Sequence, residues 1–216
     1  MKKNALLIAA ISMSFAFASC AGGGESADAN AEASTETTEE MAAEAVAWTV
    51  DPAQSNIRWT GGTAGATVYS HFGDLKVKGG SVMTSGSTIT GGKFAVDMTS
   101  VDPKDDGYSE ENPASKLVGH LGSPDFFNVA EYPEATFEVT SVEGNQIKGN
   151  LTIRGNTNEE VIEVSGMEMM PNGTMKATGK MVFDRQKYDV AWAHYLKDTV
   201  LSDDIKLEIT LVAKKA

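Results

Sequence analysis

The chain has 216 residues, enough for one domain of moderate size and additional segments. Acidic residues outnumber basic ones 30 to 18, which excludes nucleic-acid binding by phosphate neutralisation and docking on anionic lipid through a basic patch. A single cysteine excludes an internal disulfide, so the core alone must stabilise the fold.

The N-terminus has the features of an export signal. Lys2 and Lys3 precede an apolar stretch at 5–17 that is too short to span a bilayer and ends in small residues. The run FASC at 17–20 resembles a bacterial lipobox, although Phe stands at its first position. This resemblance predicts a lipoprotein signal peptide at 1–19 and acylation of Cys20. The alternative is an ordinary secretory signal, which would leave an exported protein with a free thiol.

The segment that follows the cysteine predicts a tether. Residues 21–47 contain seven acidic residues, no basic residue and very few large apolar side chains. Such a composition cannot bury enough surface to offset its ordering entropy, so 20–47 is predicted to be the lipidated cysteine and a disordered acidic linker. The acyl anchor would hold the protein in the bacterial cell envelope. Ala21, in place of the Asp that commonly retains lipoproteins at an inner membrane, favours the outer membrane, facing the periplasm or the surface.

Residues 48–216 fit one all-β domain, because hydrophobic side chains alternate along short runs separated by Gly-rich turns. This pattern predicts an antiparallel sandwich or barrel, with Gly pairs either in hairpin turns or at bulges. Alternation disappears at 112–127, where 114–121 is predicted to form a short helix between Pro113 and Gly122. The predicted strands are 57–60, 74–78, 81–90, 93–98, 136–140, 147–154, 161–165, 175–183 and 205–212.

The alternation also predicts an inward face. An eight-stranded barrel is just wide enough either to be filled by side chains or to hold one small ligand, and the pattern alone favours neither. The predicted inward residues are Ile57, Trp59, Leu75, Val77, Phe94, Val96, Met98, Phe137, Val139, Leu151, Ile153, Phe183, Leu207 and Ile209.

Several segments, in order along the domain, resemble the YceI-like family. They are WTVD at 48–51, HLGSPDFFNV at 120–129, YPEATFE at 132–138, GNLTIRG at 149–155, FDR at 183–185 and SDDIKL at 202–207. The chain departs from the family at 117–119, where many relatives carry an Arg and an Asp or Asn, and at 61–66, where a Gly-rich run looks inserted.

The resemblance implies a single extended antiparallel lipocalin-like β-barrel that binds an apolar lipid, isoprenoid or quinone-like, in its cavity. No cofactor is predicted, and the sequence leaves the ligand's identity and the oligomeric state open. The residues predicted to bind the ligand are Trp59, Leu75, Val77, Phe94, Val96, Met98, His120, Phe126, Phe127, Phe137, Val139, Leu151, Ile153 and Phe183.

Some of these residues also have structural interpretations. Phe126 and Phe127 are adjacent, so on an extended segment their rings face opposite ways, and only one is expected to join the core. His120 either satisfies a backbone carbonyl or contacts a ligand. Asp184 and Arg185 either tie neighbouring loops or clamp a head group. Three methionines before Pro171 suit a binding surface or a loop folded over a barrel end: Met167, Met169 and Met170.

Enzymatic signatures are weak. His71, His120 and His194 lack the paired spacing of a metal site, and no nucleophile elbow, phosphate loop or dinucleotide fingerprint occurs. The sequence therefore predicts a non-enzymatic lipid-binding envelope lipoprotein without a metal. A protein-interaction module with a filled barrel is the alternative, and a hydrolase is a third reading.

Overall fold

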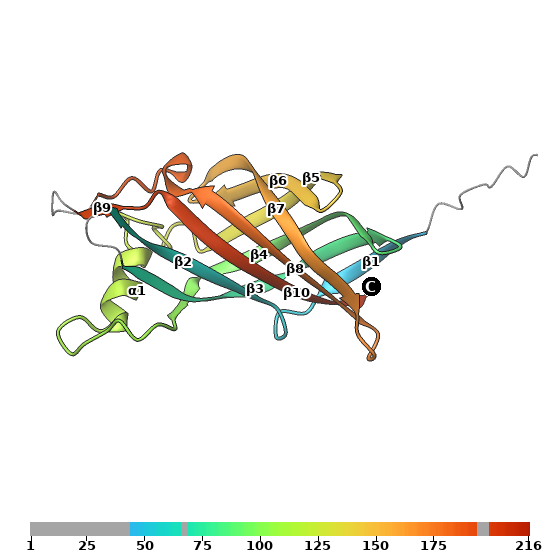
Figure 1. Cartoon of the computed structure of the whole chain (residues 1–216), viewed down its shortest axis with the longest axis horizontal. Helices are drawn as coiled ribbons and strands as arrows, with labels where there is room; N and C mark the ends of the chain where they lie inside the picture. The colour runs from blue at the N-terminus through green and yellow to red at the C-terminus, as the bar shows by residue number, and fades with distance from the viewer. Residues whose placement is uncertain (1–43, 66–68, 194–198) are drawn as a thin grey trace, which may run out of the picture. The chain divides into compact units, whose positions relative to one another are not determined.

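The computed structural model describes residues 44–65, 69–193 and 199–216, and the predicted signal peptide, Cys20 and most of the linker lie outside these ranges. Eight antiparallel strands close into a barrel because the last of them, β10, pairs with the first, β2 (Figure 1). This confirms the predicted all-β barrel. The eight strands are β2 (Asn56–Gly65), β3 (Ser70–Ser85), β4 (Thr88–Pro103), β5 (Glu134–Glu143), β6 (Gln146–Ile153), β7 (Asn156–Met169), β8 (Thr174–Asp184) and β10 (Asp204–Lys215).

Two short strands complete the sheet at opposite ends of the barrel (Figure 1). β1 (Ala45–Val50) takes over the position of β2 between β3 and β10, and β9 (Thr199–Leu201) pairs with the other end of β2. A turn at 51–55 joins β1 to β2. β1 begins three residues before the expected start of the domain, so 45–47 are part of the sheet.

The glycine pairs of β3 and β4 lie inside strands, so the interpretation of them as hairpin turns is wrong. The β3–β4 hairpin instead turns at Gly86, and the register shifts beside Gly79, which makes this region a bulge. A Cβ on Gly80 would lie 2.2 Å from the carbonyl oxygen of Lys93. Glycine is required there because the two backbones approach closely where the strands bend.

The remaining turns and the helix follow the sequence pattern. Arg154 and Gly155 both have positive φ between β6 and β7, as a tight hairpin requires. The predicted helix is α1 (Ala114–Gly122), preceded by Pro113 as its N-cap residue. A short 3₁₀ helix, η1 (Arg185–Tyr188), follows β8.

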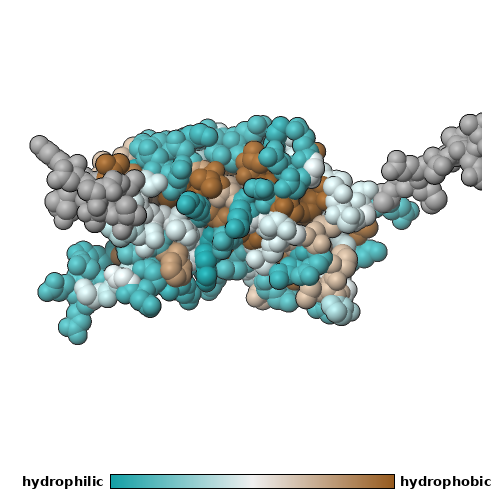
Figure 2. Space-filling model, in the orientation of Figure 1, coloured by the Kyte–Doolittle hydropathy of each residue, from teal (hydrophilic) through white to brown (hydrophobic). Residues whose placement is uncertain are grey.

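The outer wall mixes charged and apolar side chains. It carries cross-strand ion pairs, such as Lys93 with Glu138 at 3.1 Å on β4 and β5. It also carries exposed apolar residues, such as Val161 on β7 and Val182 on β8. Figure 2 shows the same mixture on one face, where apolar and hydrophilic side chains alternate across the strands.

The end of the barrel around β1 is filled by side chains, which we call the packed half. Its interior is closed by buried residues of several strands: Trp48, Val50, Val82, Ile147, Ile162, Met175, Ala177, Leu211 and Ala213. The one polar side-chain atom of Trp48, Nε1, donates a hydrogen bond to Oγ1 of Thr84 at 3.0 Å. Of the two alternatives that the alternation left open, a filled core and a ligand cavity, the filled core describes this half.

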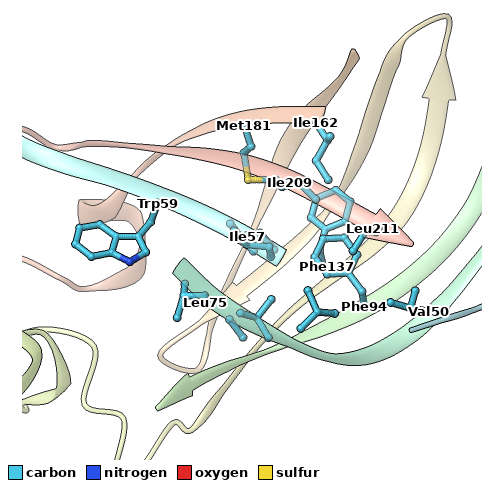
Figure 3. Close-up of a cluster of buried hydrophobic side chains, with 14 of the residues drawn as sticks. Val50, Ile57, Trp59, Leu75, Phe94, Phe137, Ile162, Met181, Ile209 and Leu211 are labelled. Carbon is cyan, nitrogen blue, oxygen red and sulfur yellow. The ribbon is translucent and has the colours of Figure 1, made fainter. Parts of the chain in front are cut away.

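Phe94 and Phe137 bound the packed half. Their ring centroids stack 5.7 Å apart, and in Figure 3 they lie between Trp59 on one side and Val50 on the other. Gly149 makes room for this pair, because a Cβ at that position would lie 2.4 Å from Cζ of Phe137. Because Gly149 on β6 has no side chain, the Phe137 ring can lie across the barrel.

We predict that Phe137→Ala destabilises the fold by about 3–5 kcal/mol, because it removes a ring that is 1% exposed and leaves a cavity. Urea unfolding followed by circular dichroism measures the loss. Val182→Ala, on the outer wall, should change stability by less than about 0.5 kcal/mol. Similar small effects in both variants would contradict the role given to Phe137.

Candidate ligand-binding cavity

The other half of the barrel is hollow. It contains a cavity of about 700 Å³ whose lining comes from β2, β3, β4, β5, β6, β8, β9, β10, α1 and nearby loops. Phe94 and Phe137 form its floor, and we call the opposite end, bordered by His71, Tyr108 and Lys116, the mouth. The volume falls within the roughly 300–1,000 Å³ range of small-molecule sites.

The inward-facing residues of each strand show how far the cavity extends into the barrel. On β5, Ala135 and Phe137 line it, whereas Val139, farther from the mouth, does not. On β10, Leu207 and Ile209 line it, whereas Leu211 belongs to the packed half. The same inward face therefore forms the cavity wall near the mouth and the packed core at the other end.

The structure brings twelve of the fourteen predicted ligand-binding residues together on the cavity wall. They are Trp59, Leu75, Phe94, Val96, Met98, His120, Phe126, Phe127, Phe137, Leu151, Ile153 and Phe183. Val77 and Val139 do not line the cavity, which corrects their assignment. Each lies one inward step deeper than a lining residue of its strand, Leu75 or Phe137, and so falls beyond the floor. Contact of the twelve with a ligand stays a prediction.

Phe126 and Phe127 both line the cavity, so the expectation that their rings face opposite ways is wrong. Residues 124–127 form a turn rather than an extended segment, and this brings the two rings into edge-to-face contact at 5.1 Å. Phe126 is buried and Phe127 is half-buried. Alternation predicts opposite faces only where the backbone is extended.

Two polar atoms lie buried in this apolar wall. Within the described part of the chain, Nε1 of Trp59 and Nε2 of His120 have no hydrogen-bond partner. The His120 ring is packed against Trp192, with centroids 4.6 Å apart, and against Phe126 at 5.3 Å. His120 therefore does not satisfy a carbonyl through Nε2.

A hydrogen-bonded cluster at the mouth was missed by the sequence analysis. The carboxylate of Asp105 is 3.0 Å from Nδ1 of His71 and accepts a bond of 2.7 Å from the hydroxyl of Tyr108. It also accepts bonds from the amides of Phe72 and Gly107. Asp105 thus ties the loop after β4 to β3. Its one sequence signal was the turn-forming run DDG at 105–107.

These contacts set the ionisation of Asp105. Burial by itself raises the pKa of this carboxyl, but the hydrogen bonds from His71, Tyr108 and the two amides outweigh it and hold the pKa at about 2. The same burial, together with the neighbouring carboxylate, raises the pKa of Tyr108.

Arg185 ties the loops on the opposite side of the mouth. Its buried guanidinium donates to the carbonyls of Val190 and Ser202 and to the carboxylate of Asp203, the last at 2.9 Å. Asp184 accepts a hydrogen bond from the amide of Gln186. Of the two interpretations of this acid–base pair, loop tying is confirmed. The segment after η1, which Arg185 holds through the carbonyl of Val190, also contains Trp192. Trp192 lines the cavity, but it lies outside the strands, so the alternating pattern did not predict it.

The methionines before Pro171 lie away from the cavity. Met167 packs against the core at the packed end, and Met169 and Met170 are exposed. In the described ranges no three His, Cys, Asp or Glu side chains gather as metal ligands. None of the described helices has the length and apolar character needed to cross a bilayer.

We predict that Asp105→Asn makes the protein less stable by about 1–2 kcal/mol at pH 7. The folded-state pKa of Asp105 lies below its unfolded value of 3.8, so the ionised carboxylate contributes stability above about pH 4. This contribution is lost as the pH falls through about 2. The difference between wild type and variant should therefore shrink between pH 4 and 2 in denaturant titrations. Asp106→Asn, at an exposed neighbour, is the control, and a difference that is constant with pH would contradict the assignment.

Comparison with known proteins identifies relatives of this barrel. The sequence model of the YceI-like domain matches residues 48–213. UPF0312 protein SAB2563 of Staphylococcus aureus (strain bovine RF122 / ET3-1) is 38% identical over 96 residues, which cover 41% of this chain and 56% of that protein. UPF0312 protein SA2479 of strain N315 is 36% identical over the same shares. The chain thus spans about half the length of these curated relatives.

A solved structure supports the fold. BcnA of Burkholderia cenocepacia superposes with a TM-score of 0.56 at 18% identity, covering 76% of this chain and 99% of that one. At this identity the likeness shows the architecture alone. The family match is broader, since it extends from β1 almost to the end of β10, and the chain therefore belongs to the YceI-like domain family.

Proposed function

We propose that this chain is an exported lipoprotein that binds an apolar lipid, of the isoprenoid or quinone-like type, in its barrel and is not an enzyme. The observation that carries the proposal is the cavity of about 700 Å³. Its wall is built mainly from aliphatic and aromatic side chains, such as Ile57, Leu75 and Ile209. The ligand class implied by the family resemblance is compatible with this lining.

Apolar burial would supply most of the affinity. Each CH₂ group that leaves water gains about 0.8 kcal/mol, so a chain of isoprene units needs few polar contacts to bind tightly. The floor of Phe94 and Phe137 would limit how deeply such a chain enters. The mouth, bordered by His71 and Lys116, would be the path by which the ligand enters and leaves the cavity.

The polar groups of the cavity support a binding role over catalysis. The Asp105 carboxylate is occupied by four donors, and the His71 nitrogen nearest to it is engaged in that cluster. The buried nitrogen of His120 lies among aromatic rings, and no carboxylate of the described residues is bonded to it. Acid–base catalysis by a histidine usually relies on such a partner.

The predicted anchor supports a place in the cell envelope. Cys20 follows an apolar segment and small residues, and the acidic linker after it would separate the barrel from the membrane surface. The described chain enters the barrel through β1, at the end opposite to α1 and β9 (Figure 1). The linker would therefore reach the packed half, and ligand exchange would take place at the mouth.

A bulky substitution in the cavity tests the binding function. We predict that Val96→Trp lowers the amount of lipid that organic extraction and mass spectrometry recover from the purified protein. The new ring has room in the hollow half, so the melting temperature should change little. Val182→Trp places the same ring on the outer wall and should leave the lipid content unchanged.

The alternative is a protein-interaction module whose barrel interior is filled by side chains, and it predicts lost stability instead of lost lipid. In a filled interior Val96→Trp overpacks the core and destabilises it by about 1–3 kcal/mol. Wild-type protein without extractable lipid, combined with a strongly lowered melting temperature in Val96→Trp, would overturn the lipid-binding proposal.

The anchor has a separate test. We predict that Cys20→Ser releases the protein from the membrane fraction or leaves the precursor unprocessed. Stable anchoring needs two or more acyl chains, which acylation of the thiol and the amine of Cys20 would supply, and serine has no thiol to acylate. Membrane fractionation and the mass of the intact protein measure the change. Ser19→Ala keeps a small residue before the cysteine and should behave like wild type. Unchanged mass and fractionation of Cys20→Ser would contradict lipidation.

A further inference from the structure

We propose that Trp59 and His120 form a head-group site inside the cavity, which binds the oxygen of a neutral amphipathic lipid. This inference rests on the proposed lipid-binding function and names the class of ligand that the cavity selects. Both residues line the cavity, Trp59 from β2 and His120 from α1.

Trp59 supplies a hydrogen-bond donor in an apolar setting. Its side chain belongs to a residue that is 8% exposed, and within the described chain its Nε1 is buried without a partner. Figure 3 shows the indole inside the barrel, on the mouth side of Ile57 and Leu75. An indole N–H only donates, so its partner must be an acceptor such as a carbonyl, ether or hydroxyl oxygen.

The other buried tryptophan of the barrel provides an internal comparison. Trp48 is just as buried, but it lies in the packed half and donates to Thr84 at 3.0 Å. Buried donors in proteins are nearly always paired. The tryptophan that contacts only the protein has a partner within the chain, whereas the tryptophan that lines the cavity has none, and this contrast points to a ligand oxygen at Trp59.

His120 supplies a second polar atom to the same cavity. Phe126 and Trp192 hold its ring by aromatic contacts, and Nε2 is buried without a partner in the described chain. An imidazole nitrogen donates or accepts according to its tautomer. His120 therefore suits a hydroxyl as well as a carbonyl oxygen.

The charges around the cavity favour a neutral head group. Lys116 is the one Lys or Arg among the lining residues that the structure describes, and its Nζ is exposed and bonded to Oδ1 of Asn112 at 2.9 Å. His71 is already paired with the Asp105 carboxylate. Phosphate sites are typically built from several Arg or Lys side chains or from backbone amides. An anionic head at the level of Trp59 would be desolvated without a counter-charge.

The polarity of the wall also sets the orientation of the lipid. The floor around Phe94 and Phe137 presents rings and aliphatic groups, whereas the two unpaired nitrogens lie nearer the mouth. The tail therefore points towards the floor, and the oxygen of the head group lies at the level of Trp59 and His120.

Three probes that share one tail test this site: geranylgeraniol, geranylgeranyl phosphate and the hydrocarbon that lacks the hydroxyl. Their binding to purified full-length protein is measured by displacement of a fluorescent lipid. In wild type the alcohol should bind at least about tenfold more tightly than the phosphate, because the desolvated anion finds no cation.

Trp59→Phe keeps an aromatic ring and removes the N–H. It should weaken binding of the alcohol about 3- to 10-fold, the range of a single hydrogen bond, and leave the hydrocarbon within about twofold. Unchanged hydrocarbon affinity shows that the cavity is intact. Trp48→Phe removes the N–H of the packed half and should alter neither affinity. If Trp59→Phe does not fold, His120→Phe serves in its place with the same expectation.

Different failures identify different errors. If none of the three probes binds wild type, the proposed function fails together with this inference. If the hydrocarbon and the alcohol bind but Trp59→Phe weakens both equally or neither, the barrel binds lipid and the head-group site is wrong. Tighter binding of the phosphate than of the alcohol would overturn the choice of a neutral head group.

Discussion

The stacked rings of Phe94 and Phe137 divide the barrel interior, and the rest of the structure depends on this division. Side chains around a cavity lack packing partners on one side, and the dispersion energy that they lose has to be offset by packing elsewhere in the fold. In this chain the packed half offsets it without help from a disulfide, because the domain contains no cysteine. Closure of the sheet between β10 and β2 adds a continuous hydrogen-bonded wall around both halves.

The mouth is shaped by polar contacts rather than by packing. Asp105 fastens the loop after β4 to β3, and Arg185 fastens the segments after η1 and before β10. Both groups are largely removed from water, with the Asp105 side chain 9% exposed and that of Arg185 3% exposed. Their charges therefore interact with hydrogen-bonding groups of the protein itself. Among the described residues, Nε1 of Trp59 and Nε2 of His120 are the two buried side-chain polar atoms without a hydrogen-bond partner, and both residues line the cavity. The proposed head-group site rests on these two atoms.

The agreement between sequence and structure is uneven across the candidate site. Residues on strands, such as Leu75, Val96 and Leu151, were predicted correctly as inward-facing because strand side chains alternate with a period of two. Phe126 and Phe127 were found through their motif, but their arrangement was wrong because a turn replaces the extended backbone. Trp192 and the Asp105 cluster were missed, because loops carry no periodicity and their partners are distant in sequence.

Local chemistry in the sequence therefore determined the class of fold, most of the inward face, the short helix after Pro113 and the tight turn at Arg154 and Gly155. Each of these depends on residues within a few positions of one another. Tertiary structure alone decided where the interior is filled and where it is hollow. Whether Val139 or Phe137 meets empty space depends on strand register, on the bulges beside Gly79 and beside Val139, and on the missing side chain of Gly149 on a neighbouring strand. Those relations join positions far apart in the chain, and no local pattern records them.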